Sequence, residues 1–195
     1  MKKRIKDIAD LRVGYQFRGK VTLDPGSSLR VIQIKDIDPD LRIRVDDLAN
    51  VHVDRPEPYV TQLGDVLFLS RGYRLYAVVV PEVQPNTVAT GYFLILRPKG
   101  KVVLPEYLAW SMNQVGFQQS LRPYLRGSHM PMVSKADVEG LRIPLPAIVV
   151  QRQILRLNDL LDKERQLSAE IQDRRKLLIQ AVARKLMRET DGERE

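Results

Sequence analysis

The sequence predicts an α+β (mixed α/β) globular domain followed by one long helix. Short runs of alternating apolar and polar residues fill most of the first hundred positions, and this two-residue period is typical of half-buried strands. Pro144 and Pro146 then end this part of the chain, because proline is tolerated only in the first turn of a helix. From there to Gly192 the chain has neither proline nor glycine and is rich in good helix formers. We therefore expect a domain over 1–146, a helix over 147–190 and a disordered tail over 191–195.

The first half of the domain is predicted to contain a short helical turn and several strands. Residues 4–10 can form one helical turn. Residues 11–23 alternate as a strand, and the turn residues of 24–28 follow them. A second strand is expected over 29–37, and 41–45 is a candidate for another short strand in an acidic, loop-rich segment.

The second half of the domain changes from strands to helices. Strands are expected over 65–70, 75–80 and 91–99, with 71–74 as the turn between the first two. A helix is expected to start at Pro105, and a short one over 134–141, where Ser134 and Asp137 have the spacing of a capping box. Strands followed by helices favour a largely antiparallel sheet.

The long helix carries the pattern of a coiled coil. A three–four spacing places six residues on one seam, with Glu164, Arg174 and Lys185 as charged interruptions; the six are Leu157, Leu160, Leu167, Ile171, Leu178 and Ala181. At about 1.5 Å per residue the helix is roughly 65 Å long, more than the side of a small domain can cover. We expect pairing with another helix in a coiled coil. The alternative is a surface helix packed on its own domain.

The composition excludes several classes of protein to which this chain could belong. The 195 residues contain no cysteine, which excludes disulfides, cysteine-based zinc sites and a thiol nucleophile. No apolar run is long enough to span a membrane, and the basic N-terminus lacks the apolar stretch of a signal peptide, so we expect a cytoplasmic protein. The net charge is +8. Residues 1–146 carry 21 basic and 15 acidic side chains, whereas 147–195 carry 11 and 9, which suits a domain that contacts a polyanion and a helix that contacts protein.

An enzyme is not expected. The chain lacks a glycine-rich phosphate-binding loop and an Asn-Pro-Pro-aromatic segment, and His52 and His129 lack the spacing of a zinc site. Ser70 and Ser128 have no nucleophile-elbow context. We therefore expect no catalytic residue, no metal and no cofactor.

Three segments in order resemble the specificity subunit of type I restriction–modification systems. They are GDVLFLSRG (64–72), LPEYLAWSMNQ (104–114) and the run from GSHMPMVSKADVEGLRIPLP (127–146) to QRQI (151–154), and VIQIKDID (31–38) is also similar. The family usually has two units of one target-recognition domain and one helix, so this chain looks like a half-subunit. Val149 and Val150 depart from the family, which often has an acidic residue before Gln151.

Candidate DNA-binding residues lie mainly in turns. Arg71 and Arg74 flank a glycine after a strand, where a guanidinium can reach a guanine edge or a phosphate. Tyr73 in the same turn is the one aromatic residue expected to be exposed, unlike Tyr15, Tyr92 and Trp110. The further candidates are Arg122, Arg126, Ser128 and His129 around Gly127, Arg42 and Arg44 on the expected strand, and Lys99 and Lys101 in a turn. For Arg71 and Arg74 the alternative is a solvated hairpin tip, and for Lys99 and Lys101 it is a plain surface turn.

The resemblance implies a non-catalytic DNA-binding subunit that reads one half of a split target in double-stranded DNA. It also implies two partners, a methyltransferase (modification) subunit that uses S-adenosylmethionine and an ATP-driven restriction subunit. We expect a homodimer through the long helix and a role in phage defence. The resemblance implies an antiparallel coiled coil, because this places two recognition domains at opposite ends, as in the two-unit family members. The alternative is a coiled-coil scaffold protein that does not bind DNA.

Overall fold

The computed structural model describes residues 1–81 and 86–192, with side chains described as far as Arg184. Compact units form over Met1–Arg152 and Gln153–Glu195, so the globular unit includes the first turn of the long helix. This boundary lies a few residues beyond the expected one. The expected tail begins at 191, but the helix continues through Gly192, and 193–195 lie outside the described residues.

A four-stranded antiparallel sheet forms the centre of the globular unit. Its order is β2 (Ala9–Val13), β8 (Phe93–Pro98), β5 (Val66–Leu69) and β6 (Ala77–Val79). All of β5 and most of β8 are buried, which explains their nearly continuous apolar sequences. The expectation of a largely antiparallel sheet is confirmed for this sheet.

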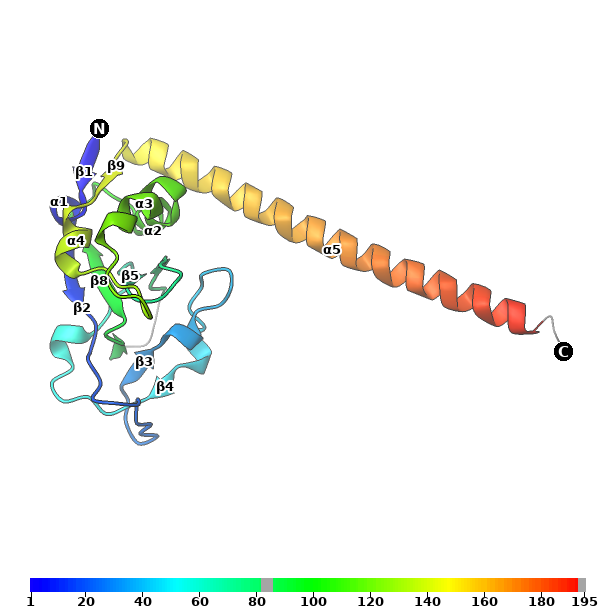
Figure 1. Ribbon diagram of the computed structural model, residues 1–195, viewed down its shortest axis with the longest axis horizontal. Coiled ribbons are helices and arrows are strands. Elements are labelled where there is room, and N and C mark those ends of the chain that lie inside the picture. Colours follow the sequence, from blue (N-terminus) through cyan, green and yellow to red (C-terminus); the bar gives the residue numbers. More distant parts are fainter. Residues whose placement is uncertain (82–85, 193–195) are drawn as a thin grey trace. The chain divides into compact units, whose positions relative to one another are not determined.

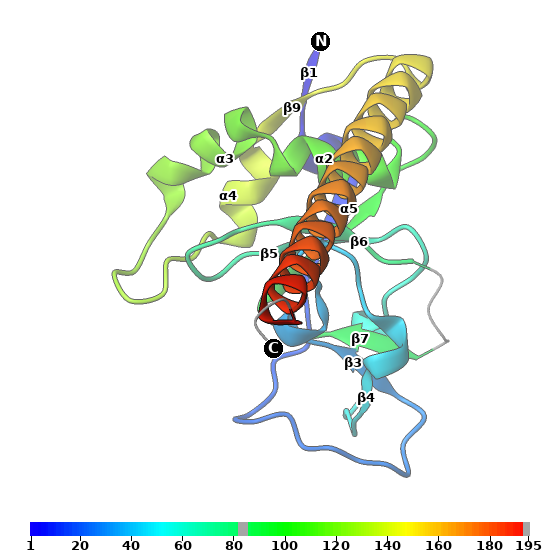
Figure 2. The same ribbon diagram turned by 90° about the vertical axis from the view of Figure 1, so that its right-hand side faces the viewer.

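A smaller sheet lies at one end of the unit and the short helices at the other (Figures 1 and 2). The small sheet has the order β4 (Ala49–Asn50), β3 (Arg30–Ile32) and β7 (Thr87–Ala89), with β3 and β7 parallel. The helices are α1 (Ile5–Ile8), α2 (Pro105–Asn113), α3 (Val115–Leu121) and α4 (Lys135–Gly140). Single 3-10 turns are η1 (Ile34–Asp36), η2 (Val45–Asp47), η3 (Glu57–Tyr59) and η4 (Arg122–Tyr124).

Several expected elements are confirmed. Helix α1 falls within 4–10, the hairpin of β5 and β6 within 65–80, and β8 within 91–99. Ser134 caps α4: its hydroxyl accepts the backbone N–H of Asp137 at 3.2 Å, and Asp137 accepts the Ser134 N–H at 3.1 Å. The capping box expected from the sequence is present.

The expected strand over 11–23 is wrong beyond Val13. The Gly14 N–H donates to the Phe93 carbonyl, and the Tyr15 N–H donates to the Ala89 carbonyl, so the chain leaves β8 and crosses to the small sheet. Tyr15, Phe17 and Val21 pack against the core cluster of that sheet. Their alternation reflects contacts of an irregular segment rather than a strand.

Two further strands are shorter than expected, and one helix is divided. The strand expected over 29–37 ends at Ile32, because Gln33 and Asp36 form a capping box that starts η1. In 41–45 only Ile43 forms a β-bridge. The helix from Pro105 breaks at Gln114, where Asn113 pairs both amide atoms with the backbone of Ala77 at 2.8 Å.

A pairing that the sequence analysis missed joins the N-terminus to the segment before the long helix. Strand β1 (Lys2–Arg4) pairs antiparallel with β9 (Arg142–Pro144) (Figure 1). Helix α5 (Ile148–Gly192) then begins, and the side chain of Gln151 is fully buried. Gln151 accepts the Leu104 N–H and donates to the carbonyls of Val102 and Pro146, so its hydrogen bonds fix the first turn of α5 within the globular unit.

Candidate nucleic-acid interface

The turn between β5 and β6 meets the loop 125–133 through backbone pairing. The Gly72 N–H donates to the Pro131 carbonyl at 2.8 Å, and the Val133 N–H donates to the Ser70 carbonyl at 3.0 Å. Arg71 and Arg126 each form a β-bridge with Met132, so Met132 lies between the two arginine-bearing segments. We call the surface formed by 70–75 and 122–133 the basic tip.

Glycines allow both sharp turns of the basic tip. Gly72 has φ +111° and Gly127 has φ +93°, which side chains rarely adopt. In addition, a Cβ on Gly127 would lie 3.2 Å from the Met130 carbonyl oxygen. The two glycines therefore determine the backbone path at both turns, and this path sets the directions of the neighbouring arginine side chains.

The exposed side chains of the tip include basic and aromatic groups, together with the apolar Leu125, Met130 and Met132. Tyr73 is 83% exposed, as expected, and its hydroxyl donates to the His129 carbonyl at 3.1 Å, which joins the two segments a second time. The guanidinium of Arg71 lies 5.8 Å from the ring centre of Tyr92. That ring is also exposed, so the expectation that Tyr92 is a core residue is wrong.

The charge of the tip is nearly uncompensated. Neither 66–81 nor 107–136, the segments that contain the tip, has an acidic residue. Arg126 lies 3.4 Å from Asp137 at the start of α4, and this is the one ion pair described for a residue of the tip. The hydroxyl of Ser134 donates to Asp137 and, with the charge of Arg126 as a smaller cause, lowers the pKa of this carboxyl below its ordinary value. Asp137 is thus held ionised beside one arginine, whereas Arg74 and Arg122 are exposed and no ion pair is described for either.

A cavity of about 400 Å³ opens beside the tip. Its lining combines the turn after β5, helix α3 and the loop after it: Gly72, Tyr73, Leu75, Asn113, Val115, Gln118, Gln119, Leu121, Arg122, Leu125 and Pro131. Arg122 therefore belongs to the same surface as Tyr73. An exposed aromatic ring, several amides and guanidinium groups are the side chains that bind phosphates and base edges.

The structure brings together seven of the candidate residues: Arg71, Tyr73, Arg74, Arg122, Arg126, Ser128 and His129. Arg42 and Arg44 lie on a separate loop that Ile43 anchors in the core. Arg44 donates to the Lys35 carbonyl and pairs with Asp47 at 4.0 Å, so its guanidinium is bound within its own loop.

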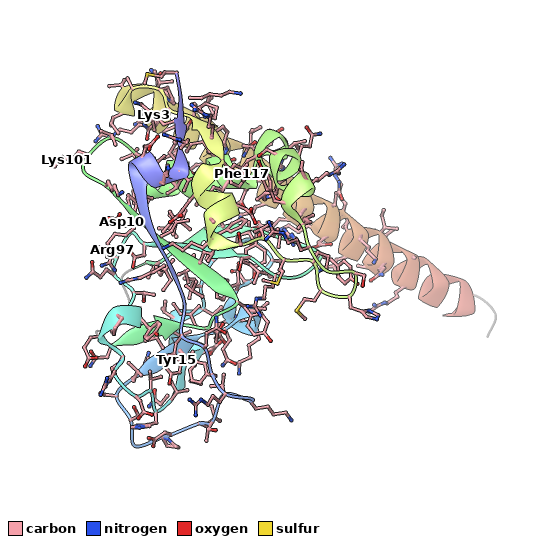
Figure 3. All side chains as sticks on the ribbon, turned by 60° about the vertical axis from the view of Figure 1, so that its left-hand side comes forward. Lys3, Asp10, Tyr15, Arg97, Lys101 and Phe117 are labelled. Carbon is pink, nitrogen blue, oxygen red and sulfur yellow. The ribbon has the colours of Figure 1, made fainter. Side chains whose placement is uncertain are left out.

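Lys99 and Lys101 lie at the other end of the central sheet. Leu69, next to the tip, pairs with the first residue of β8, whereas Lys99 follows the last residue, about 20 Å along the strand. The ammonium group of Lys99 forms an ion pair of 2.8 Å with Asp10 and donates a hydrogen bond to the Lys6 carbonyl. Figure 3 labels Lys101 in the loop that follows β8.

The sequence analysis missed a buried carboxylate that orders the sheet. Asp65 is 1% exposed and accepts two hydrogen bonds of 2.8 Å from Arg97 on β8. Arg12 on β2 lies 3.4 Å from the same carboxylate, and the Gln62 N–H donates to it at 2.9 Å. The hydrogen bonds that Arg97 donates to Asp65 raise the pKa of Arg97, whereas burial lowers the pKa of Arg12. The sequence predicts Asp65 only as the first residue of a strand, because one acidic residue before an apolar run is an ordinary strand boundary.

Other kinds of site receive no support from the described part of the chain. Over 1–81 and 86–192, no three His, Cys, Asp or Glu residues gather as metal ligands would. In the same residues, no helix has both the length and the apolar character needed to cross a membrane.

Comparison with known proteins gives matches among solved structures. Neither the protein-family models nor the curated proteins match this chain. The S subunit of a type I restriction–modification system from M. genitalium is 13% identical, with a TM-score of 0.56, over 84% of this chain and 39% of that one. The HsdS subunit from Thermoanaerobacter tengcongensis is 19% identical, with a TM-score of 0.60, over 84% and 37%. A chain from a study of complex assembly in the type I restriction–modification system is 19% identical, with a TM-score of 0.61, over 84% and 38%.

These matches define the fold. The chain has the architecture of the type I S subunits, a mixed α/β domain followed by a long helix, and it spans about two fifths of the length of the matched chains. The resemblance expected from the sequence is confirmed at the level of the fold.

Proposed function

We propose that this protein is a DNA-recognition (specificity) subunit of a type I restriction–modification system. The observation that carries the proposal is the basic tip, where two segments about 55 residues apart in sequence combine their arginines on one surface. The fold, which is that of S subunits, supports the same function. The domain reads one half of a split target in double-stranded DNA.

The tip has groups for two kinds of contact. Arg71, Arg74 and Arg126 reach phosphates or the acceptor atoms of guanine, and phosphate contacts give salt-dependent affinity while base contacts give specificity. Tyr73 adds an exposed ring with little conformational freedom, because its hydroxyl is bound to the backbone of the opposite segment. The subunit itself is non-catalytic.

Chemistry on DNA belongs to partner subunits in this proposal. A methyltransferase subunit supplies S-adenosylmethionine-dependent methylation, and a restriction subunit supplies ATP-driven cleavage. Support comes from the fold of the S subunits and from one matched chain, which was determined in a study of complex assembly in such a system. We propose that the protein acts in the cytoplasm in phage defence.

The long helix pairs with a second copy of the chain. The apolar seam residues from Leu157 to Leu178 are at least half exposed, although burial of a leucine side chain is worth about 1.5–3 kcal/mol. A homodimer through α5 covers this seam and joins two recognition domains. L167E combined with I171E should therefore give monomers in sedimentation analysis, whereas two glutamates on the polar face should not.

A mobility shift with random duplex DNA at low and moderate salt tests the DNA-binding function. We expect a complex at low salt that weakens as salt rises, because counterions released from phosphates drive binding. A protein that forms dimers but shifts no duplex at either salt would contradict the proposal and indicate a coiled-coil scaffold.

A further inference from the structure

Charged residues interrupt the apolar seam of α5, and two of them, Glu164 and Arg174, lie in the part of the helix whose side chains are described. Glu164 and Arg174 occupy seam positions between Leu160, Leu167, Ile171 and Leu178, and all six side chains are exposed. In the described part of the helix neither charge forms an ion pair within its own chain; the ion pair described there joins Arg165 and Asp162. A dimer that buries this seam must therefore provide a partner for both charges or leave them unpaired.

We propose that the second copy binds antiparallel with its two-fold axis at Ala169, so that Glu164 of each copy faces Arg174 of the other. In an antiparallel pair each seam residue faces the one equally far on the other side of the axis. The layers are then Leu157 with Ala181, Leu160 with Leu178, Glu164 with Arg174, and Leu167 with Ile171, and each occurs twice. This proposal deepens the homodimer proposed above and uses α5 alone.

Other antiparallel registers bury the charges against apolar residues. A shift of one heptad in one direction places Glu164 against Leu167 and Arg174 against Leu157. The opposite shift places Glu164 against Ala181 and Arg174 against Ile171. An unpaired charge in an apolar interface is strongly unfavourable, whereas a paired one is nearly neutral, so the charges select the register more than they add affinity.

The charges also select the direction of pairing. In a parallel dimer in register, each seam residue faces its own copy, so Glu164 would face Glu164 and Arg174 would face Arg174. Both layers would then repel. The antiparallel arrangement converts the same two residues into two attractive layers, one on each side of the axis.

Cysteine cross-linking tests the register, because the chain has no cysteine of its own. L160C and L178C are made separately, mixed and oxidised with oxidised glutathione. We expect a disulfide-linked heterodimer from the mixture and none from either variant alone, because the two L160C thiols of one dimer are about 27 Å apart along the axis. Cross-linking of either variant alone would indicate a parallel dimer, and failure of the mixture would indicate a different register. Either result would overturn the proposal.

Charge exchange gives a second test that leaves the apolar layers intact. E164R and R174E should each raise the dimer Kd by about tenfold or more, and the double variant E164R/R174E should return it to the parent value. D173R and K176E make the same changes on the outward face and should have little effect. Single variants that dimerise like the parent, or a double variant no better than the singles, would contradict the register. DNA binding by the basic tip is measured separately, so the two failures are distinguishable.

Discussion

At the scale of single residues, Asp65 connects three strands of the central sheet through its side chain. Its buried carboxylate accepts hydrogen bonds from Arg97 and Arg12 on the two strands beyond it, and without it these two guanidinium groups would lie close together with no negative charge between them. The hydrogen bond to Asp65 also raises the pKa of Arg97, which is a consequence of the same interaction.

We predict that Asp65→Asn lowers the free energy of unfolding by about 2–4 kcal/mol, less than for a fully buried pair because both arginines are partly exposed. Asp10→Asn is the matched control. It breaks the exposed pair with Lys99 and should cost less than about 1 kcal/mol. Urea unfolding measures both, and equal losses would contradict the role of Asp65.

Asp137 gives a pH dependence whose sign follows from its lowered pKa. Its folded pKa lies below the ordinary 3.8, so the ionised form stabilises α4 above that pH, and this stability is lost as pH falls through the folded pKa. Asp137→Asn should therefore destabilise the domain at pH 7 and converge with the parent near the acid limit. Thermal unfolding at several pH values tests this, with Glu139→Gln as the control on the same helix. A difference that is constant with pH would contradict it.

At the scale of elements, the sequence predicts a strand or a helix cap correctly where its residue pattern has only one structural explanation. The buried strands β5 and β8 and the Ser134–Asp137 capping box are of this kind. Residues 11–23 have the period of a strand, but at Gly14 the chain leaves β8 and crosses to the small sheet, and the sequence has no signal for that contact. Likewise the candidate arginines could be selected from their turns, whereas their assembly through Met132 depends on tertiary pairing.

Because the backbone at Gly14 lies very close to the small sheet, we predict that this position tolerates only glycine. A Cβ there would lie 2.6 Å from the Ala89 carbonyl oxygen and closer still to that of Thr90. Gly14→Ala should cost about 1–3 kcal/mol through overpacking. Gly116→Ala, at an open position in α3, should instead stabilise by up to about 1 kcal/mol. Unfolding midpoints that shift alike would contradict the close approach.

At the scale of the whole molecule, a symmetric dimer must read a symmetric target. Two identical recognition domains related by a two-fold axis select an interrupted palindrome, with two inverted half-sites and an unspecified gap. Removal of one heptad from the middle of α5, about 10 Å, should shorten the preferred gap by about 3 base pairs. Selection from a random duplex pool measures the gap, and an asymmetric split target would mean that the second domain comes from a different chain.

The most direct test of the basic tip compares the salt dependence of DNA binding for two variants of equal charge. R71A/R74A removes two positive charges from the tip, and K99A/K101A removes two from the far end of the sheet. We predict that R71A/R74A weakens binding and flattens the slope of log K against log salt by about one unit for each phosphate that these arginines neutralise, while K99A/K101A stays close to the parent. Equal effects of the two variants, or an unchanged R71A/R74A, would contradict the assignment of the basic tip as the DNA-binding surface.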